Sequence, residues 1–498
     1  MKILTAKEIQ QMETDYMHQA NINSLELMEM ASISFVNWFV QAFPSPCTVI
    51  VCCGPGKNGG DGLVISRLLH RHAYTVEVYF LAGSKYAEEF TSNKEKLQQL
   101  IPVKEIHSVE DFPELNKASI VLDALFGIGI NKPLAGPAAE LVHYINRSKA
   151  TIISIDIASG LLPADLTEGG AIVEPTVTVT FQVPKLSFML PQYFKNVGEL
   201  VLLDIGIPQE IQHAIPSNYL FADKETILPW LKKRSKIAHK GTYGKALVIG
   251  GSYGMIGAAL LAAKAGYCTG AGLLRMYIPA CGYTIAQTAL PEAMVLTDPS
   301  FTEITTIPDL QPYNAIAIGP GMKESDGGKD ALVALLKQAK FPLVIDAGAL
   351  NILGENRELM ALIPPNSILT PHPKEFERLT KAFPNDFERL KGLQSFSKQI
   401  SSIVILKGAN TAIALPNGQV YFNSTGNPGM ATGGSGDVLC GIITGLLAQT
   451  YTAEQAAVLG VFLHGYAGDS AAEKYSQEAM LASNIIEGIA AFYKEMMK

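Results

Sequence analysis

The chain has 498 residues, of which 48% are hydrophobic and 17% charged, and its formal net charge is −7. This length exceeds one hydrophobic core and predicts two or three domains, with the composition of a soluble α/β enzyme rather than a disordered or fibrous chain. The acidic balance excludes the basic footprint of nucleic-acid or anionic-membrane binding, and no apolar run approaches bilayer-spanning length.

The six cysteines have no regular spacing. They therefore predict neither a disulfide framework nor a zinc site, and we expect reduced, buried thiols of the kind found in the cytosol. The N-terminus turns polar at Lys2 and lacks the apolar core of a signal peptide. Together these features predict a cytoplasmic protein whose partners include neither nucleic acid nor a membrane.

Residues 7–43 are predicted to form two helices, because Ile9, Met12 and Tyr16 recur at helical spacing and Ser24 can cap the second segment. Short β-branched runs follow at 48–53, 75–81, 120–125, 152–157 and 177–183. Helix-compatible segments separate most of them, at 63–70, 93–100 and 138–145. Strands alternating with helices predict right-handed βαβ units and a parallel sheet covered on both faces.

A glycine-rich segment, 54–62, follows the first run and precedes the predicted helix. It formally satisfies Gly-x-Gly-x-x-Gly, and Glu77 stands at about the right distance for a ribose contact, which would indicate a nicotinamide dehydrogenase. The motif is weak alone. Pro55 inside the turn and the second acid Asp61 fit pyrophosphate binding poorly.

Polar residues stand at or just beyond the ends of three predicted strands, namely Asn58, Asp123 and Ser159. Ligands of open α/β sheets bind at the carboxyl ends of the strands, so these side chains can converge there. Their oxygens suit a hard cation. The alternative is that Asp123 and Asp156 merely cap turns.

Residues 199–206 are predicted as the last strand of this series, and the polar and charged stretch 208–235 contains the domain boundary. We therefore expect two α/β domains, at 1–215 and 222–498. A second βα series begins at 245, with a strand to 249 and a small-residue helix at 258–266. No Gly-Lys-Ser/Thr is present, which excludes a P-loop ATPase. Helices are predicted at about 453–474 and 482–496.

Several strand ends of this second series carry candidate residues. His372 stands between two prolines, and a structural and a functional role are about equally favoured. Lys407 is followed by small residues at a strand-to-hairpin turn, which suits a nucleotide phosphate; the alternative is an ordinary surface lysine.

The stretch 427–439 combines four glycines with a single carboxylate, Asp437, and runs into an apolar helix from about Val438. Glycine amides and a helix N-terminus favour an anion. Taken alone, Asp437 is equally compatible with an N-terminal helix cap and with a base that takes a proton from a hydroxyl attacking phosphate.

The motifs of the second half occur in a recognisable order: Lys-Gly-Thr-Tyr-Gly-Lys at 240–245, Gly-Pro-Gly at 319–321, His-Pro-Lys-Glu-Phe at 372–376, Lys-Gly-Ala at 407–409, and 427–439. This set resembles the ADP/ATP-dependent NAD(P)H-hydrate dehydratases, which have a ribokinase-like αβα fold. The first half resembles the NAD(P)H-hydrate epimerases, with a Rossmann-like three-layer αβα fold, through 58–62, 123–127 and 156–160. Together they resemble the fused bifunctional repair family over essentially the whole chain.

The resemblance implies a nicotinamide cofactor repair enzyme, an isomerase and a lyase in one chain. Its substrates would be NADH and NADPH hydrated at C6 of the ring, together with ADP. The first domain would interconvert the R and S epimers, and the second would dehydrate the S form while cleaving ADP to AMP and phosphate. Potassium in the first domain, Mg²⁺ in the second and a homo-oligomeric state are implied as well.

The resemblance also assigns residues. In the second domain Asp437 would be the base and would contact the hydrate together with Ala258, Gly321 and His372; the nucleotide would meet Lys407, Gly408, Ala409, Asn410, Thr411 and Gly436. In the first domain Asp156 would be the acid/base group, with Asp123 as the second choice, and potassium would be held by Asn58, Asp123 and Ser159. Hydrate contacts there would be Lys57, Asn58, Gly59, Gly60, Asp61, Gly127, Ile128, Gly129, Ile130, Asn131, Lys132, Pro133 and Asp156.

Two positions depart from the family pattern. Lys57 replaces an asparagine, and Gly348 replaces an acid after Asp346, which puts a metal role for that loop in doubt. The competing hypotheses are a ribokinase-like vitamin or sugar kinase, a nucleotide-binding regulator with a decayed domain, and the dehydrogenase. The kinase leaves the first domain unexplained, and intact Asp123 and Asp437 argue against decay.

Overall fold

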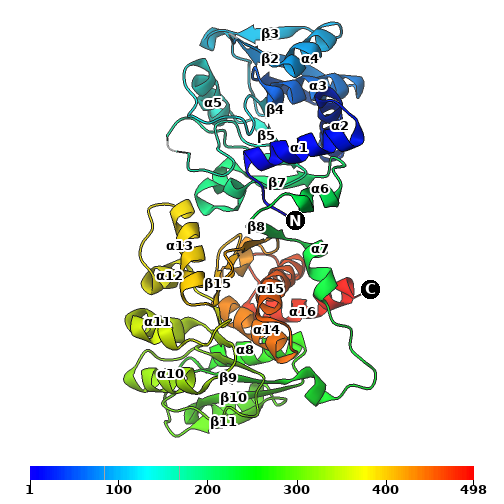
Figure 1. Ribbon diagram of the computed structural model, residues 1–498. Coiled ribbons are helices and arrows are strands. Elements are labelled where there is room, and N and C mark those ends of the chain that lie inside the picture. Colours follow the sequence, from blue (N-terminus) through cyan, green and yellow to red (C-terminus); the bar gives the residue numbers. More distant parts are fainter. Residues whose placement is uncertain (84, 168, 498) are drawn as a thin grey trace. The chain divides into compact units, whose positions relative to one another are not determined.

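A computed structural model describes residues 1–83, 85–167 and 169–497, and the chain divides into two compact units (Figure 1). The N-terminal unit comprises residues 2–217. The C-terminal unit comprises the described residues from 218 onward, together with Met1. Each unit is an α/β fold with its own sheet and core, as the alternating strand and helix patterns predicted.

The described part of the N-terminal unit contains one parallel sheet of seven strands in the order β3-β2-β1-β4-β5-β6-β7. Its buried strands are nearly continuous apolar runs, because helices cover both faces of a parallel sheet. The strands are β1 (Thr48–Cys53), β2 (Thr75–Leu81), β3 (Val103–Ile106), β4 (Ser119–Ala124), β5 (Thr151–Ile155), β6 (Val177–Phe181) and β7 (Glu199–Leu203).

The strand order reverses direction between β1 and β4, so right-handed crossovers place α3 and α4 on one face and α5 on the other (Figure 1). Such a reversal opens a crevice at the carboxyl ends of the two strands. The helices are α1 (Ala6–Ala20), α2 (Ser24–Ala42), α3 (Lys57–Arg71), α4 (Glu88–Gln98), α5 (Pro137–Arg147) and α6 (Gln209–Ala214).

Helix α3 begins at Lys57, six residues before the predicted segment, so the prediction of a loop through residue 62 was wrong. Glycine is required in this first part of the helix by close packing on the sheet. A Cβ on Gly59 would lie 1.9 Å from the carbonyl oxygen of Gly54, and one on Gly62 would lie 2.5 Å from the Cβ of Ala124. The glycines therefore let the helix start directly above the end of β1.

The described part of the C-terminal unit contains a ten-stranded sheet in the order β11-β10-β9-β12-β13-β14-β15-β16-β17-β8. It is parallel except where β16 pairs with β15 and β17. The strands are β8 (Tyr219–Ala222), β9 (Lys245–Ile249), β10 (Leu273–Pro279), β11 (Met294–Asp298), β12 (Ala315–Ile318), β13 (Leu343–Ile345), β14 (Ile368–Leu369), β15 (Ile403–Leu406), β16 (Ala412–Ala414) and β17 (Val420–Asn423).

Sequence reasoning missed the edge strand β8, because its four residues follow a polar, turn-rich stretch. Tyr219–Ala222 pairs in parallel with Val420–Asn423, so backbone hydrogen bonds to a distant segment determine this strand. The stretch between the two series is therefore not a free linker. It also contains α7 (Lys224–Ile227).

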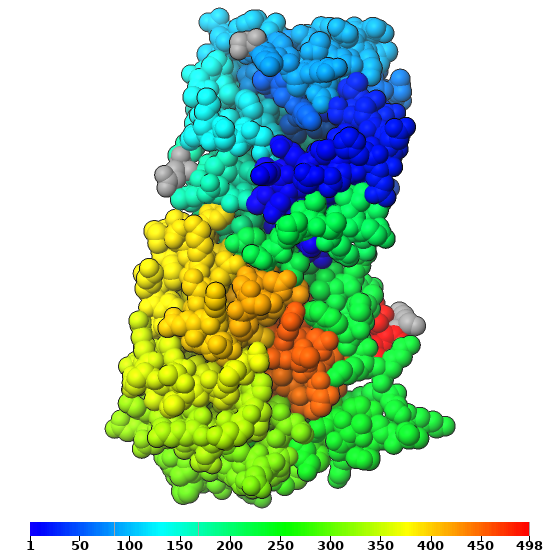
Figure 2. Space-filling view, viewed as in Figure 1, coloured from blue at the N-terminus to red at the C-terminus, as the bar shows by residue number. Residues whose placement is uncertain are grey.

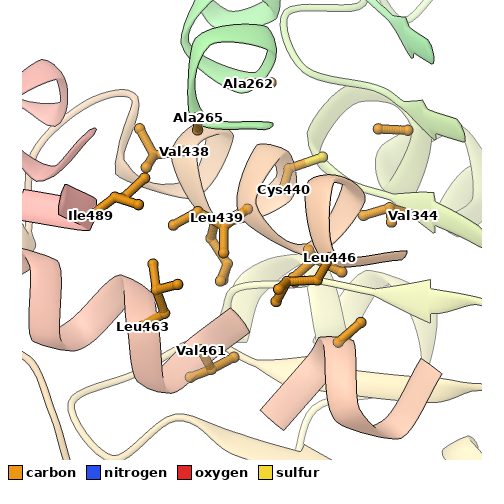
Figure 3. Close-up of a cluster of buried hydrophobic side chains, with 14 of the residues drawn as sticks. Ala262, Ala265, Val344, Val438, Leu439, Cys440, Leu446, Val461, Leu463 and Ile489 are labelled. Atoms are coloured by element: carbon orange, nitrogen blue, oxygen red, sulfur yellow. The ribbon is translucent and has the colours of Figure 1, made fainter. Parts of the chain in front are cut away.

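Helices α8, α14, α15 and α16 pack together on one face of the C-terminal sheet, and Figure 3 shows the apolar core around α14. Val438, Leu439, Cys440 and Leu446 are buried there. A Cβ on Gly441 would lie 2.0 Å from the carbonyl oxygen of Ala262, so α14 touches α8 backbone to backbone. The helices are α8 (Ile256–Thr269), α9 (Tyr283–Ala289), α10 (Asp326–Gln338), α11 (Ala347–Glu355), α12 (Pro373–Leu379), α13 (Asp386–Gln399), α14 (Ser435–Ala448), α15 (Ala453–Tyr475) and α16 (Ala482–Met496).

All six cysteines are free, but only some fit the predicted burial. Cys52, Cys53 and Cys440 are buried, Cys47 and Cys281 are partly exposed, and Cys268 is exposed. Over the described residues, every helix is too short or too polar to serve as a membrane span.

Candidate functional sites

A cavity of about 420 Å³ opens at the carboxyl ends of the strands in the N-terminal unit. Helices α1 and α2, the start of α3 and the loop after β4 form its walls. It brings together eight of the predicted residues, namely Lys57, Asn58, Asp61, Gly127, Ile128, Gly129, Ile130 and Asp156. Gly59 and Gly60 lie within α3 behind this wall, and Asn131, Lys132 and Pro133 continue the loop as exposed residues.

Asp123 is buried near the end of β4, and its carboxyl group accepts hydrogen bonds from three residues. One carboxyl oxygen accepts from the backbone amide of Ser159 at 2.9 Å and from the hydroxyl of Ser154 at 2.8 Å. The other accepts from the hydroxyl of Ser159 at 2.5 Å and from the amide of Leu125 at 3.3 Å. Burial raises the pKa of Asp123, while these hydrogen bonds lower it.

Asn58, in the first turn of α3, has a side-chain amide whose hydrogen bonding is incomplete. Its side-chain oxygen and nitrogen are both buried and lack hydrogen-bond partners among the described residues. A Cβ on Gly127 would lie 3.3 Å from the Cβ of Asn58, so the loop after β4 rests directly on this side chain. A buried amide without partners costs free energy. A cation held by the amide oxygen, with Asp123 and Ser159 nearby, would remove that cost.

Asp156 directly follows β5 and has a φ of 67°, in the left-handed region that few side chains adopt. Its Oδ1 accepts hydrogen bonds from the ammonium group of Lys185 at 2.5 Å and from the hydroxyl of Thr180 at 3.2 Å. The Lys185 side chain is only 1% exposed. The strained backbone and the ion pair together fix the carboxyl group at the cavity wall.

Besides Asp156, three carboxyl groups line the same cavity: Glu13 from α1, Asp61 from α3 and Glu89 from α4. Burial, with a smaller contribution from the charge of Asp156, raises the pKa of Glu13 to about 7, while Lys57 and Lys185 oppose this rise. Burial also raises the pKa of Asp61 well above its usual range. In the space-filling view, α1 (dark blue) lies at the surface of this unit, so its inner side faces the cavity (Figure 2).

Sequence reasoning missed Glu13 and Lys185, although each left a signal. Glu13 stands beside the apolar stripe of Ile9 and Met12 in its helix, and Lys185 interrupts a largely apolar run. By contrast, Glu77 lies within β2 and is paired with Lys104 at 3.1 Å, away from the strand end where a ribose would bind. Glu77 is therefore not placed to contact a ribose, as the dehydrogenase hypothesis requires.

The C-terminal unit has a cavity of about 770 Å³ at the start of α14. It is lined by predicted residues His372, Lys407, Gly408, Ala409, Thr411 and Gly436, and by Ser435, Thr425 and His464. Asn410 belongs to the same turn but not to the described lining. Ala258 and Gly321 lie outside it against one another, since a Cβ on Gly321 would lie 3.0 Å from that of Ala258.

Lys407 is the charged centre of this cavity. Its Nζ lies 3.1 Å from Oδ1 of Asp346 and 3.9 Å from Oε2 of Glu375, and a Cβ on Gly436 would lie 3.3 Å from it. The two carboxylates hold the pKa of Lys407 above its usual range despite burial, so the ammonium group stays charged. A fixed positive charge over a glycine-rich helix start suits an anion.

Asp437 does not occupy the N-cap position of α14, and its role as a base stays a prediction. Gly434, with a φ of 91°, occupies the N-cap position, and Asp437 lies in the first turn without a capping hydrogen bond. Burial, with a smaller contribution from the charge of Asp346, raises the pKa of Asp437 to about 7, while Lys407 opposes this rise. A carboxyl group with a pKa near neutrality is suited to proton transfer.

His372 has a structural role in addition to its place in the cavity wall. It caps α12, with Nδ1 accepting hydrogen bonds from the backbone amides of Lys374 and Glu375. A second histidine, His464, escaped sequence reasoning because it lies inside the long apolar helix α15. Burial lowers its pKa to about 4, and its Nε2 lies 3.3 Å from the hydroxyl of Ser435.

Metal ligation by clusters of acids, histidines and cysteines is not supported, since no group of three such side chains is in place among the described residues. A cation in the N-terminal unit would instead rest on Asn58, Asp123 and Ser159.

Comparison with known proteins identifies similar chains for both units. Two family models match, one described as NAD(P)H-hydrate dehydratase over residues 246–491 and one as YjeF-related protein N-terminus over residues 24–187. The bifunctional NAD(P)H-hydrate repair enzyme Nnr of Moorella thermoacetica is 35% identical over 98% of this chain and 96% of its own length. That of Coxiella burnetii is 33% identical over 94% of each chain. A crystal structure of the ADP/ATP-dependent NAD(P)H-hydrate dehydratase of Bacillus subtilis, grown with ATP and Mg²⁺, is 30% identical, with a TM-score of 0.50, over 56% of this chain and 100% of that one.

Proposed function

This chain belongs to the family of bifunctional NAD(P)H-hydrate repair enzymes, and from that premise we propose how its two sites divide the work. As a member it is an NAD(P)H-hydrate epimerase and an ADP/ATP-dependent NAD(P)H-hydrate dehydratase, and it uses a nucleotide as co-substrate. The finer assignment gives epimerisation to the cavity around Asp156 and dehydration to the cavity at the start of α14, where Asp437 lies in the first turn next to the lining residue Gly436.

The dehydratase site must convert the C6 hydroxyl of the hydrate into a good leaving group. Transfer of the terminal phosphoryl group of ADP onto that hydroxyl releases AMP, and elimination of phosphate then restores the ring double bond. Asp437 takes the hydroxyl proton, and the amides at the start of α14 hold the transferring phosphoryl group. The observation that carries this proposal is the raised pKa of Asp437, in the first turn of a helix beside Lys407.

Lys407 is the residue that binds the nucleotide phosphates. Its charge is balanced by Asp346 and Glu375. Both carboxylates supply hard oxygen atoms and so fit Mg²⁺, which when bound would neutralise phosphate charge. Gly348 supplies no further acid at this loop, so Asp346 and Glu375 are the protein groups that would hold the ion. Ala258, Gly321 and His372 bind the hydrate, and Gly436 binds the AMP moiety.

In the epimerase site, Asp156 is the acid/base group and Asn58, Asp123 and Ser159 hold a potassium ion. The partnerless amide of Asn58 and the buried charge of Asp123 support this donor set. When bound, potassium would offset that charge and fix the loop after β4. Lys57, Asn58, Asp61 and residues 127–130 then surround the hydrate, with Lys57 offering its charge to a phosphate of the cofactor, and Gly59 and Gly60 support this wall from within α3.

The alternative of a ribokinase-like vitamin or sugar kinase leaves the N-terminal unit unexplained. The test adds ADP or ATP to hydrated NADH with the full-length protein. We expect NADH absorbance to return with equimolar AMP from ADP. Unchanged absorbance, with phosphorylation of a vitamin alcohol instead, would contradict the proposal.

A further inference from the structure

Glu13 is a cavity carboxyl group that the proposed epimerase reaction does not yet use. It comes from α1, whereas Asp156 follows β5, so the two acids enter the cavity from separate elements. They are close enough to interact electrostatically. A half-buried carboxyl group with a raised pKa in a cavity wall is a candidate for acid/base chemistry.

The chemistry of the substrate sets a requirement for two such groups. The hydroxyl-bearing carbon C6 is bonded to the ring nitrogen N1, so it is a carbinolamine carbon. When the C6–O bond breaks, its electron pair leaves with oxygen, the nitrogen lone pair forms an N1=C6 bond, and the oxygen takes a proton to leave as water. A water molecule then adds to the opposite face of C6, which breaks the N1=C6 π bond and returns its electron pair to N1, and the added oxygen loses a proton to the base.

One turnover thus consumes one proton from an acid and delivers one proton to a base, on two faces of the ring, with no other reactant. A site that runs this reaction in both directions needs two acid/base groups, one protonated and one ionised.

We propose that Glu13 is the second acid/base group of the epimerase site and acts opposite Asp156. The proposal rests on the assignment of epimerisation to this cavity. For one epimer, Glu13 protonates the departing hydroxyl and Asp156 takes the proton of the adding water. For the other epimer the roles are exchanged.

The charges around the two acids support this division. Asp156 forms an ion pair with Lys185 at 2.5 Å. Glu13 shares the cavity with Asp61 and Lys57 of α3 and with Asp156 and Lys185, and its pKa of about 7 keeps part of it protonated near neutral pH. Glu89 from α4 lies 3.5 Å from Lys57 and balances it. Helix α6 packs on α1, and its Glu210 and His213 are exposed.

The test measures epimerisation alone. Purified S hydrate is given to the full-length protein without nucleotide, and the approach to the R/S mixture is followed by chromatography between pH 5.5 and 9, corrected for the uncatalysed rate. We expect Glu13→Gln to lower kcat about 10²–10³-fold with little change in KM. We also expect it to abolish the decline in rate that the wild type shows above pH about 7. Asp15→Asn, an exposed change on the same helix, should leave rate and pH profile unchanged.

Two results would overturn the proposal: a Glu13→Gln rate within about threefold of wild type, or a Glu13→Gln rate that still declines at the same pH as the wild-type rate. Retained dehydratase activity shows that the variant is folded. If Glu13→Gln does not fold, Glu13→Asp decides the question: it should keep a declining limb at a shifted pH with a reduced rate, and an unaltered profile would count against Glu13. Asp156→Asn distinguishes a failure of the Glu13 proposal from a failure of the proposed function. Full epimerase activity in that variant would contradict the assignment of epimerisation to this cavity.

Discussion

The ammonium group of Lys185 lies 2.5 Å from Oδ1 of Asp156 and 2.5 Å from the hydroxyl of Thr180, with its side chain only 1% exposed. A buried charge pair of this kind fixes geometry, and removal of one partner leaves the other uncompensated. Lys185 also lines the cavity, and it therefore belongs to the description of the epimerase site.

We predict that Lys185→Met lowers the epimerase kcat at least about tenfold, because Asp156 loses the partner that orients it. Combined with Asp156→Asn, the effects should be strongly non-additive, since both changes remove one interaction. Lys185→Arg should recover part of the rate. Additive effects would show that Lys185 acts independently of Asp156.

The pKa of about 7 at Asp437 predicts a pH dependence for dehydration. A base must be ionised, so kcat/KM for dehydration should rise through about pH 7 and then level off. Asp437→Asn should abolish the rate, and a wild-type rate that is flat from pH 6 to 8 would contradict the role of Asp437 as the base.

The same shift has a consequence for stability, and its sign is opposite to that of a salt-bridged acid. A raised pKa means that the folded state binds more protons than the unfolded state between about pH 4 and 7, so the charge of Asp437 progressively destabilises the fold as pH rises through this window. Asp437→Asn should therefore raise Tm at pH 8 and have little effect near pH 4. Differential scanning calorimetry at the two pH values measures this difference.

The partnerless amide of Asn58 predicts a dependence on monovalent cations in one unit only. Exchange of potassium for tetramethylammonium should slow epimerisation and leave the dehydratase rate unchanged in its usual buffer. Asn58→Ala should weaken the response to added potassium, because one oxygen ligand is lost. An epimerase rate that is the same in potassium and in tetramethylammonium would contradict the proposed role of potassium.

The close contact of α14 with α8 predicts a stability effect beneath the dehydratase site. Gly441→Ala places a methyl group against the carbonyl of Ala262 and should lower stability by about 1–3 kcal/mol, because backbone atoms cannot move aside locally. Gly257→Ala is the matched control, since an added Cβ there meets nothing within 4 Å. It should leave Tm unchanged or raise it slightly.

Features that depend on residues close together in the chain could be predicted from the sequence, whereas features that depend on contacts between distant residues could not. Asp123, Asp156 and Asp437 could be predicted as site candidates because strand ends and glycine-rich helix starts are local patterns. Strand β8 was missed because its hydrogen bonds go to Val420–Asn423, about two hundred residues away. Glu13 and Lys185 were missed for the same reason, since only packing of α1 and of the segment after β6 brings them to the cavity.

The most direct test of the account compares two single variants, Asp437→Asn and Asp156→Asn, on an R/S mixture of hydrated NADH with nucleotide. We predict that Asp437→Asn regenerates no NADH but still equilibrates the epimers. Asp156→Asn should convert the S form to NADH and leave the R form to react only at its uncatalysed epimerisation rate. Loss of both activities in either folded variant, or rapid consumption of both epimers by Asp156→Asn, would contradict the division of chemistry between two independent sites.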